Sequence, residues 1–269
     1  MEKRDKDKEF EQKLKMSFWK KRKLLGMIKK AKLDSESSLS TTKHHIVDNE
    51  KSKENQKCII DHETNPQKKK NSEILYQKNC QFEVILNMIG FVDIALIDLF
   101  SIMINLITAS GDWDKKFYAR IACMNLYELT NDILELFGND KDGNGIKRGV
   151  RPIVNDINDA TLTQIINEIR QNFANFQNKI NKNGKNYANV RNLSVAHRDH
   201  DFRTQYESIN NLSWGEVIED FMEFNTLLYY LRLFNNYLTS LFSVKYNQDI
   251  QPVLDSIRER MKETEGDKI

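Results

Sequence analysis

Residues 213–242 read SWGEVIEDFMEFNTLLYYLRLFNNYLTSLF, and this stretch decides the fold class. Its first four residues match a capping box, in which the Ser213 hydroxyl accepts a hydrogen bond from the Glu216 amide while the Glu216 side chain reaches back to the Ser213 amide. Apolar side chains then recur with the period of a helix, at Val217, Phe221, Phe224, Leu228, Leu231, Phe234, Leu238 and Leu241. So many aromatic residues predict a long helix that packs in a core or against a second subunit.

Helical periodicity extends through most of the preceding chain as well. Expected helices are an apolar one from Phe82 to Ala109, a second carrying Phe117 to Leu136, a third carrying Leu162 to Ile180, a shorter one from Tyr187 to about Ala196, and a final one from about Pro252 to Glu263. A loop of some twenty residues is expected between the second and third helices. With only 3 prolines and 10 glycines in 269 residues, the chain lacks the turns of a β sandwich or barrel. The sequence predicts an all-α fold, with a helical bundle over residues 80–269.

The apolar segment from Phe82 to Ala109 raises the question of a membrane span. Asp93 and Asp98 lie inside it. Each carboxylate near the centre of a span would cost about 2.5–3.5 kcal/mol. We therefore expect a buried helix of the bundle and no transmembrane segment.

Positive charge is concentrated at the front of the chain, because residues 1–80 carry a net charge of +8 and the remainder −6. From Phe10 to Ile28, apolar residues alternate with lysines at helical spacing, which predicts a basic amphipathic helix. This helix could bind RNA phosphates, anionic lipid or a partner, or it could pack lightly on its own domain. Leu33 to Asn79 is expected to be a flexible linker, so that residues 1–79 form a basic, largely disordered extension.

The cysteines and the N-terminal residues indicate the compartment. Cys58, Cys80 and Cys123 have no paired spacing, which argues against a disulfide framework and against CxxC zinc sites. The first residues lack the apolar core of a secretory signal. We expect a cytoplasmic protein.

Two stretches resemble metal sites only in part. Asp140 to Gly145 matches the first six positions of a calcium loop, but Lys147 and Arg151 stand where an apolar residue and a bidentate glutamate belong. Cys58 and His62 have no second pair of zinc ligands. We expect an ordinary turn at 140–145, no metal and no cofactor, and the chain contains no P-loop, GxGxxG, GxSxG or HExxH motif.

Residues 190–201, VRNLSVAHRDHD, contain the groups that metal-free RNA cleavage requires. His197 titrates near neutrality and can move a proton, and Arg191 offers a fixed positive charge to the phosphorane. The alternative interpretation is a helix cap or a surface ion pair with Asp199 or Asp201.

The run from Arg191 through Asn192 to His197 resembles the R-x(4–6)-H motif of the HEPN superfamily, with a polar residue after the arginine and a small one before the histidine. The following Arg198-Asp199 is similar to HEPN proteins of phage abortive-infection systems. The resemblance covers roughly residues 80–245. It implies a HEPN-like helical bundle and a metal-independent endoribonuclease of toxin or antiphage-defence type.

The same resemblance implies the roles of three residues. His197 would be the general base or acid, Arg191 would hold the scissile phosphate, and Asn192 would orient the site. The products would be a 2′,3′-cyclic phosphate and a 5′-hydroxyl. On an ideal helix Arg191 and His197 would lie about 120° apart, which favours a composite site at a helix end or between two subunits. The expected partners are RNA, a second copy of the chain, and an antitoxin or another defence-system protein.

Two further functions remain open. A HEPN-like module can bind nucleic acid or a partner without catalysis. Independently of the resemblance, the basic N-terminal helix is compatible with a membrane-surface or scaffold protein. The sequence favours the ribonuclease because both Arg191 and His197 are present.

Overall fold

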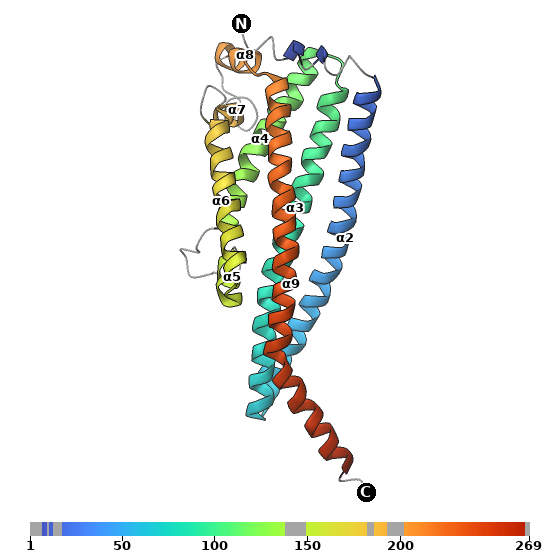
Figure 1. Ribbon diagram of the computed structural model, residues 1–269, viewed down its shortest axis with the longest axis vertical. Coiled ribbons are helices and arrows are strands. Elements are labelled where there is room, and N and C mark those ends of the chain that lie inside the picture. Colours follow the sequence, from blue (N-terminus) through green and yellow to red (C-terminus); the bar gives the residue numbers. More distant parts are fainter. Residues whose placement is uncertain are drawn as a thin grey trace.

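In the computed structural model, described for residues 7–9, 11–12, 18–137, 149–181, 186–192 and 202–266, every element of regular structure is a helix (Figure 1). The helices are α2 (Phe18–His62), α3 (Pro66–Thr108), α4 (Asp112–Leu136), α5 (Arg151–Ile157), α6 (Ala160–Asn181), α7 (Tyr187–Val190), α8 (Phe202–Asn210) and α9 (Trp214–Gly266). The predicted all-α class is confirmed.

Three long helices set the shape of the molecule. α2, α3 and α9 contain 45, 43 and 53 residues, so each is about 65–80 Å long at 1.5 Å per residue. α3 packs against both α2 and α9, and α4 and α6 pack against α9 on the side away from α2 (Figure 1). The short helices α7 and α8 lie at the end of the molecule where α2 and α9 begin.

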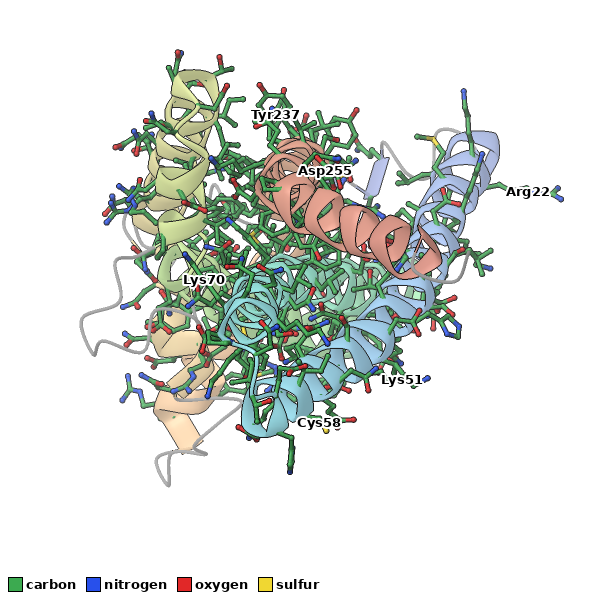
Figure 2. All side chains as sticks on the ribbon, turned by 90° about the horizontal axis from the view of Figure 1, so that it is seen from below. Arg22, Lys51, Cys58, Lys70, Tyr237 and Asp255 are labelled. Carbon is green, nitrogen blue, oxygen red and sulfur yellow. The ribbon has the colours of Figure 1, made fainter. Side chains whose placement is uncertain are left out.

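The start and the buried face of α9 agree with the sequence. The Glu216 amide donates to the Ser213 hydroxyl over 3.2 Å, and the Gly215 amide donates to the Asp7 carboxylate over 2.8 Å. The periodic residues are buried in the core: Val217, Phe221, Phe224, Leu228, Leu231, Phe234 and Leu238. The aromatic side chains of α9 are divided, since its phenylalanines are buried while Tyr229, Tyr230 and Tyr237 stay exposed. Tyr237 lies on the outer side of α9 (Figure 2).

The separate final helix expected from Pro252 is wrong, because α9 continues through Pro252 to Gly266. A proline inside a helix removes one backbone hydrogen bond and bends the helix without always ending it. The last part of α9 accordingly turns away from the bundle axis (Figure 1).

The flexible linker expected from Leu33 to Asn79 is also wrong. This segment forms most of α2 and the start of α3, which are joined by residues 63–65 into an antiparallel hairpin. The predicted domain boundary at residue 79 therefore falls inside α3. Asn65 caps α3 by accepting hydrogen bonds from the amides of Gln67 and Lys68, and Pro66 occupies its first turn.

The hairpin of α2 and α3 was not predicted because its buried positions, which recur every seven residues, are mostly polar. On α2 the buried positions recur at Ile28, Ser35, Thr42 and Asn49. On α3 they recur at Ser72, Asn79, Leu86 and Asp93. A spacing of seven is that of a coiled-coil seam, but most of these side chains are polar and so do not register as an apolar stripe. We call these eight residues the polar seam.

Hydrogen bonds between the two helices satisfy part of the polar seam. Asn49 donates to the Asn79 carbonyl over 3.0 Å, and Asn79 donates to the Ser52 hydroxyl over 2.8 Å. The Ser38 hydroxyl donates to Asp93 over 2.6 Å. On the outer side of α2, Arg22 and Lys51 project away from the bundle (Figure 2). The basic helix is thus one side of a packed hairpin, with Ile28 in the core.

α3 is long and apolar enough to span a membrane by length and composition, and 61% of its most apolar stretch is buried inside the bundle. Asp93 is 1% exposed and pairs with Arg232 of α9, while Asp98 is exposed. Burial raises the pKa of Asp93, an effect that the Ser38 hydroxyl and the Arg232 guanidinium oppose.

Between α4 and α6 the structure adds a helix where a loop was expected. α5 has Pro152 in its first turn, a position where proline favours helix initiation. Asn158 ends it in the left-handed conformation at φ 57°. Asp159 then caps α6 by accepting from the Leu162 amide over 2.7 Å. The partial calcium loop at 140–145 lies outside the described residues.

The close packing of the hairpin can be tested at Gly90. A Cβ added there would lie 3.7 Å from Thr42 Cγ2 and 3.9 Å from Leu39 Cδ1, which is ordinary contact. Gly90→Ala should therefore be neutral or stabilise the protein by up to about 1 kcal/mol. Gly90→Leu should separate α2 from α3 and cost about 1–3 kcal/mol in urea unfolding. Equal stability of the two variants would contradict this packing.

Candidate functional site

α7, which precedes the predicted motif, is anchored in the core by one tyrosine. Tyr187 is 1% exposed, and its hydroxyl donates to the buried Asp220 of α9 over 2.6 Å. Lys179 of α6 lies 3.0 Å from the other oxygen of Asp220. Burial, together with Cys123 and Asp220, raises the pKa of Tyr187 well above its ordinary value, so the phenol remains a donor. This anchor holds the short helix between α6 and α9.

Arg191 and Asn192 follow directly after this anchored helix and lie together. Arg191 is the C-cap residue of α7, and its Nε lies 2.6 Å from Glu128 Oε1 on α4. Its Nη1 donates to Asn192 Oδ1 over 3.0 Å. The side chains of Arg191 and Glu128 are 34% and 40% exposed, so the guanidinium is held in place and still open to solvent. The structure therefore brings two of the three predicted site residues into contact.

The third predicted residue cannot be placed in the same way. His197, together with Asp199, His200 and Asp201, lies outside the described residues. α7 ends at Val190. The angle of about 120° expected between Arg191 and His197 would apply only if that helix continued past Arg191.

Further acidic residues lie along α4 beyond Glu128. Asp132 and Glu135 follow Glu128 along α4 and are exposed. Burial raises the pKa of Asp132, and the carboxylates of Glu128 and Glu135 raise it further. Glu128 is the carboxylate that lies against Arg191, and a phosphate bound to Arg191 would meet its negative charge.

Sequence reasoning missed Glu128 because it lies 63 residues before Arg191 and carries no motif of its own. Only a helix-packing prediction that placed α4 beside α7 would have indicated it. The exposed Cys58 and His62 lie one turn apart on α2, with 3.9 Å between Sγ and Nδ1. Within the described ranges no three His, Cys, Asp or Glu side chains are grouped as metal ligands.

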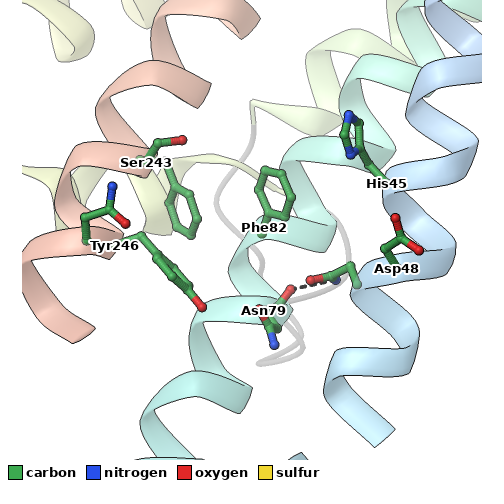
Figure 3. Close-up of a pocket in the computed structure, with 9 residues that line it drawn as sticks. His45, Asp48, Asn79, Phe82, Ser243 and Tyr246 are labelled. Carbon is green, nitrogen blue, oxygen red and sulfur yellow. Dashed lines mark hydrogen bonds between the residues drawn. The ribbon is translucent and has the colours of Figure 1, made fainter. Parts of the chain in front are cut away.

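A groove that the sequence did not indicate runs between α2 and α9, with α3 at its floor. One cavity in it, of about 410 Å³, has His45 and Asp48 of α2 on one side and Ser243 and Tyr246 of α9 on the other (Figure 3). Phe82 and Phe242 stack inside it with 5.8 Å between ring centroids. Burial raises the pKa of Tyr246.

A second cavity, of about 390 Å³, lies further toward the start of α9 in the same groove. Ser38, Asp93, Arg232 and Asn235 contribute its polar lining. Both cavities are therefore bordered by all three long helices.

No family model matches the sequence, and comparisons with curated proteins and with solved structures find no significant similarity. The relation to the HEPN superfamily consequently remains a prediction based on the residues from Arg191 to His197.

Proposed function

We propose that the protein is a metal-independent endoribonuclease of toxin or antiphage-defence type, with Arg191, Asn192 and His197 in its active site. The observation that supports this proposal best is the position of Arg191. Its guanidinium is half-exposed at the end of an anchored helix and is fixed by Glu128 and Asn192. A cation fixed before the reaction stabilises developing charge without the cost of reorganisation.

The proposed reaction needs one proton acceptor, one proton donor and one cation. A histidine, His197, takes the proton of the ribose 2′-hydroxyl, and the 2′-oxygen forms a bond to phosphorus. The bond from phosphorus to the 5′-oxygen breaks, and an imidazolium returns a proton to that oxygen. Arg191 neutralises the phosphorane, and Asn192 keeps the guanidinium oriented. The products are a 2′,3′-cyclic phosphate and a 5′-hydroxyl.

The proposal includes a homodimer in the cytoplasm, with RNA as substrate and an antitoxin or defence-system protein as a possible further partner. Three exposed tyrosines and Leu233 on α9 support a protein interface, because tyrosine is enriched in such surfaces. The buried phenylalanines of α9 no longer support it, since the core of the monomer accounts for them.

One observation favours the alternative, a non-catalytic HEPN-like module that binds nucleic acid or a partner. Glu128 places a carboxylate against Arg191, and Asp132 and Glu135 add negative charge further along α4, which suits a basic protein partner better than RNA. The two functions differ in whether purified protein cuts RNA.

The variants of the motif distinguish these functions most directly. His197→Ala and Arg191→Ala should abolish RNA cleavage, because proton transfer and charge stabilisation are each lost. Arg191→Lys should restore little activity, since an ammonium lacks the planar fork that meets Glu128 and a phosphate together. Cleavage of a labelled RNA, measured in EDTA, checks all three variants, and cleavage that required added metal would contradict the mechanism.

His200→Ala is the matched control, because it removes the same kind of side chain only three residues further on. It should cut RNA like the unmodified protein. The Arg191–Glu128 pair is partly exposed and contributes about 0–1 kcal/mol to stability, so circular dichroism should show all variants folded. A folded His197→Ala protein with full activity would refute the assignment.

Glu128 provides a second, independent test of RNA at this site. Glu128→Gln keeps an oxygen that accepts from Arg191 and removes one negative charge beside the expected phosphate. RNA should bind several-fold more tightly, corresponding to about 0.5–1 kcal/mol. Glu135→Gln, on the same helix but without contact to Arg191, should have a smaller effect. Unchanged or weaker binding by Glu128→Gln in a filter-binding assay would place the RNA elsewhere.

A further inference from the structure

The cavity of about 410 Å³ between α2, α3 and α9 contains polar groups that no interaction within the protein uses. Asp48 is exposed, and its carboxylate has no ion pair or hydrogen bond within the described residues. The Tyr246 hydroxyl also has no hydrogen-bond partner there, and it is not among the buried polar atoms without a partner, so solvent still reaches it. The Ser243 hydroxyl, by contrast, donates to the Thr239 carbonyl over 2.8 Å. We call this space the Asp48 cavity.

Asp48 sets the sign of the charge in this cavity. Among the described residues that line it, only Asp48 and His45 belong to types that carry charge near neutral pH. A histidine can be neutral or positive in this range, whereas a carboxylate is negative. Lys245, which precedes the lining Tyr246, lies 3.5 Å from Asp249 and is paired with it. The Asp48 cavity thus offers a carboxylate without a counterion, which favours a cation and disfavours an anion.

The rest of the cavity is aromatic. Phe82 and Phe242 stack with 5.8 Å between ring centroids, and Tyr246 follows at 6.1 Å from Phe242. Figure 3 shows Phe82 between Asp48 on one side of the cavity and Tyr246 on the other. Aromatic rings attract cations through their quadrupole, and they also cover the carbon groups that an organic cation carries.

A metal ion is the other cation to consider. It requires several oxygen or nitrogen ligands held close together. Within the described ranges no three His, Cys, Asp or Glu side chains are grouped in this way. One carboxylate facing aromatic rings instead suits a cation with an apolar outer surface. A volume of about 410 Å³ is in the range of pockets for small ligands.

We propose that the Asp48 cavity binds a small organic ammonium ion, with its nitrogen beside Asp48 and its carbon groups against Phe82 and Tyr246. The nitrogen is either quaternary or carries N–H groups, since both forms bring the same charge to the carboxylate and the rings. In the second form an N–H also donates to the Tyr246 hydroxyl. The cavity is bordered by α2, α3 and α9, whereas Arg191 contacts α4, so the inference does not rest on the proposed nuclease activity.

Binding is tested with the full chain by isothermal titration. Choline is compared with 3,3-dimethyl-1-butanol, which has the same shape and a carbon in place of the charged nitrogen. Choline should bind saturably, and the neutral alcohol should bind at least about tenfold more weakly, because it gains neither the ion pair nor the cation–π attraction. Spermidine forms the second arm. Tighter binding of spermidine identifies an ammonium with N–H groups as the ligand, and tighter binding of choline identifies a quaternary one.

Asp48→Asn removes the charge and keeps the size of the side chain. The affinity for the tighter-binding cation should fall at least about tenfold. Glu50→Gln is the matched control, since Glu50 is an exposed carboxylate two residues further along α2 that does not line the cavity. It removes the same charge and should change the affinity less than about twofold. Both positions are exposed, so circular dichroism should show both variants folded.

Three results would overturn the proposal: no binding of either cation, equal binding of choline and the neutral alcohol, or unchanged affinity in Asp48→Asn. The comparison with the alcohol uses the unmodified protein, so it holds even if a variant fails to fold. Cleavage assays on the same samples separate this inference from the proposed nuclease. Loss of cation binding leaves His197-dependent cleavage in place, and absence of cleavage leaves the binding result valid.

Discussion

The carboxylate of Asp93 is the point at which the three longest helices meet. One oxygen accepts from Ser38 of α2, and the other faces Arg232 of α9. Because Asp93 itself is almost fully buried in α3, both partners are needed to offset the loss of hydration. The pairing fixes α2 and α9 on either side of α3. The groove between them, with its two cavities, is a consequence of that arrangement.

The sequence predicted the helices that pack through apolar side chains. The face of α9 from Val217 to Leu238, the apolar part of α3 and the stripe of α6 follow a helical period and are buried as expected. α2 was missed because it packs through Ser35, Thr42 and Asn49, which are polar. The hydroxyls of Ser35 and Thr42 donate to carbonyls of α2 itself, and Asn49 donates to α3. Composition alone makes such a segment look disordered, since it offers little apolar surface. Pro252 misled in the opposite sense, because α9 continues through it and the proline bends the helix without ending it (Figure 1).

Within the candidate site, only the contact between residues adjacent in sequence could be predicted. Arg191 and Asn192 are adjacent in sequence, and their contact follows from the C-terminal end of α7. Glu128 reaches Arg191 only because α7 is anchored to Asp220 through Tyr187, an arrangement set by tertiary packing. The same holds for the cavity of about 390 Å³, where residues from α2, α3 and α9 converge without any shared motif. Long-range convergence of this kind leaves no periodic signal in one sequence.

The central claim is that the surface around Arg191 cuts RNA through the neighbouring 2′-hydroxyl. The chemistry of the new RNA ends tests it most directly, because attack by the 2′-oxygen and attack by water leave different termini. RNA incubated with the purified protein should acquire 2′,3′-cyclic phosphates and 5′-hydroxyls, which mass spectrometry of the fragments identifies. Fragments with 3′-hydroxyl and 5′-phosphate ends, or RNA that stays intact, would contradict the account.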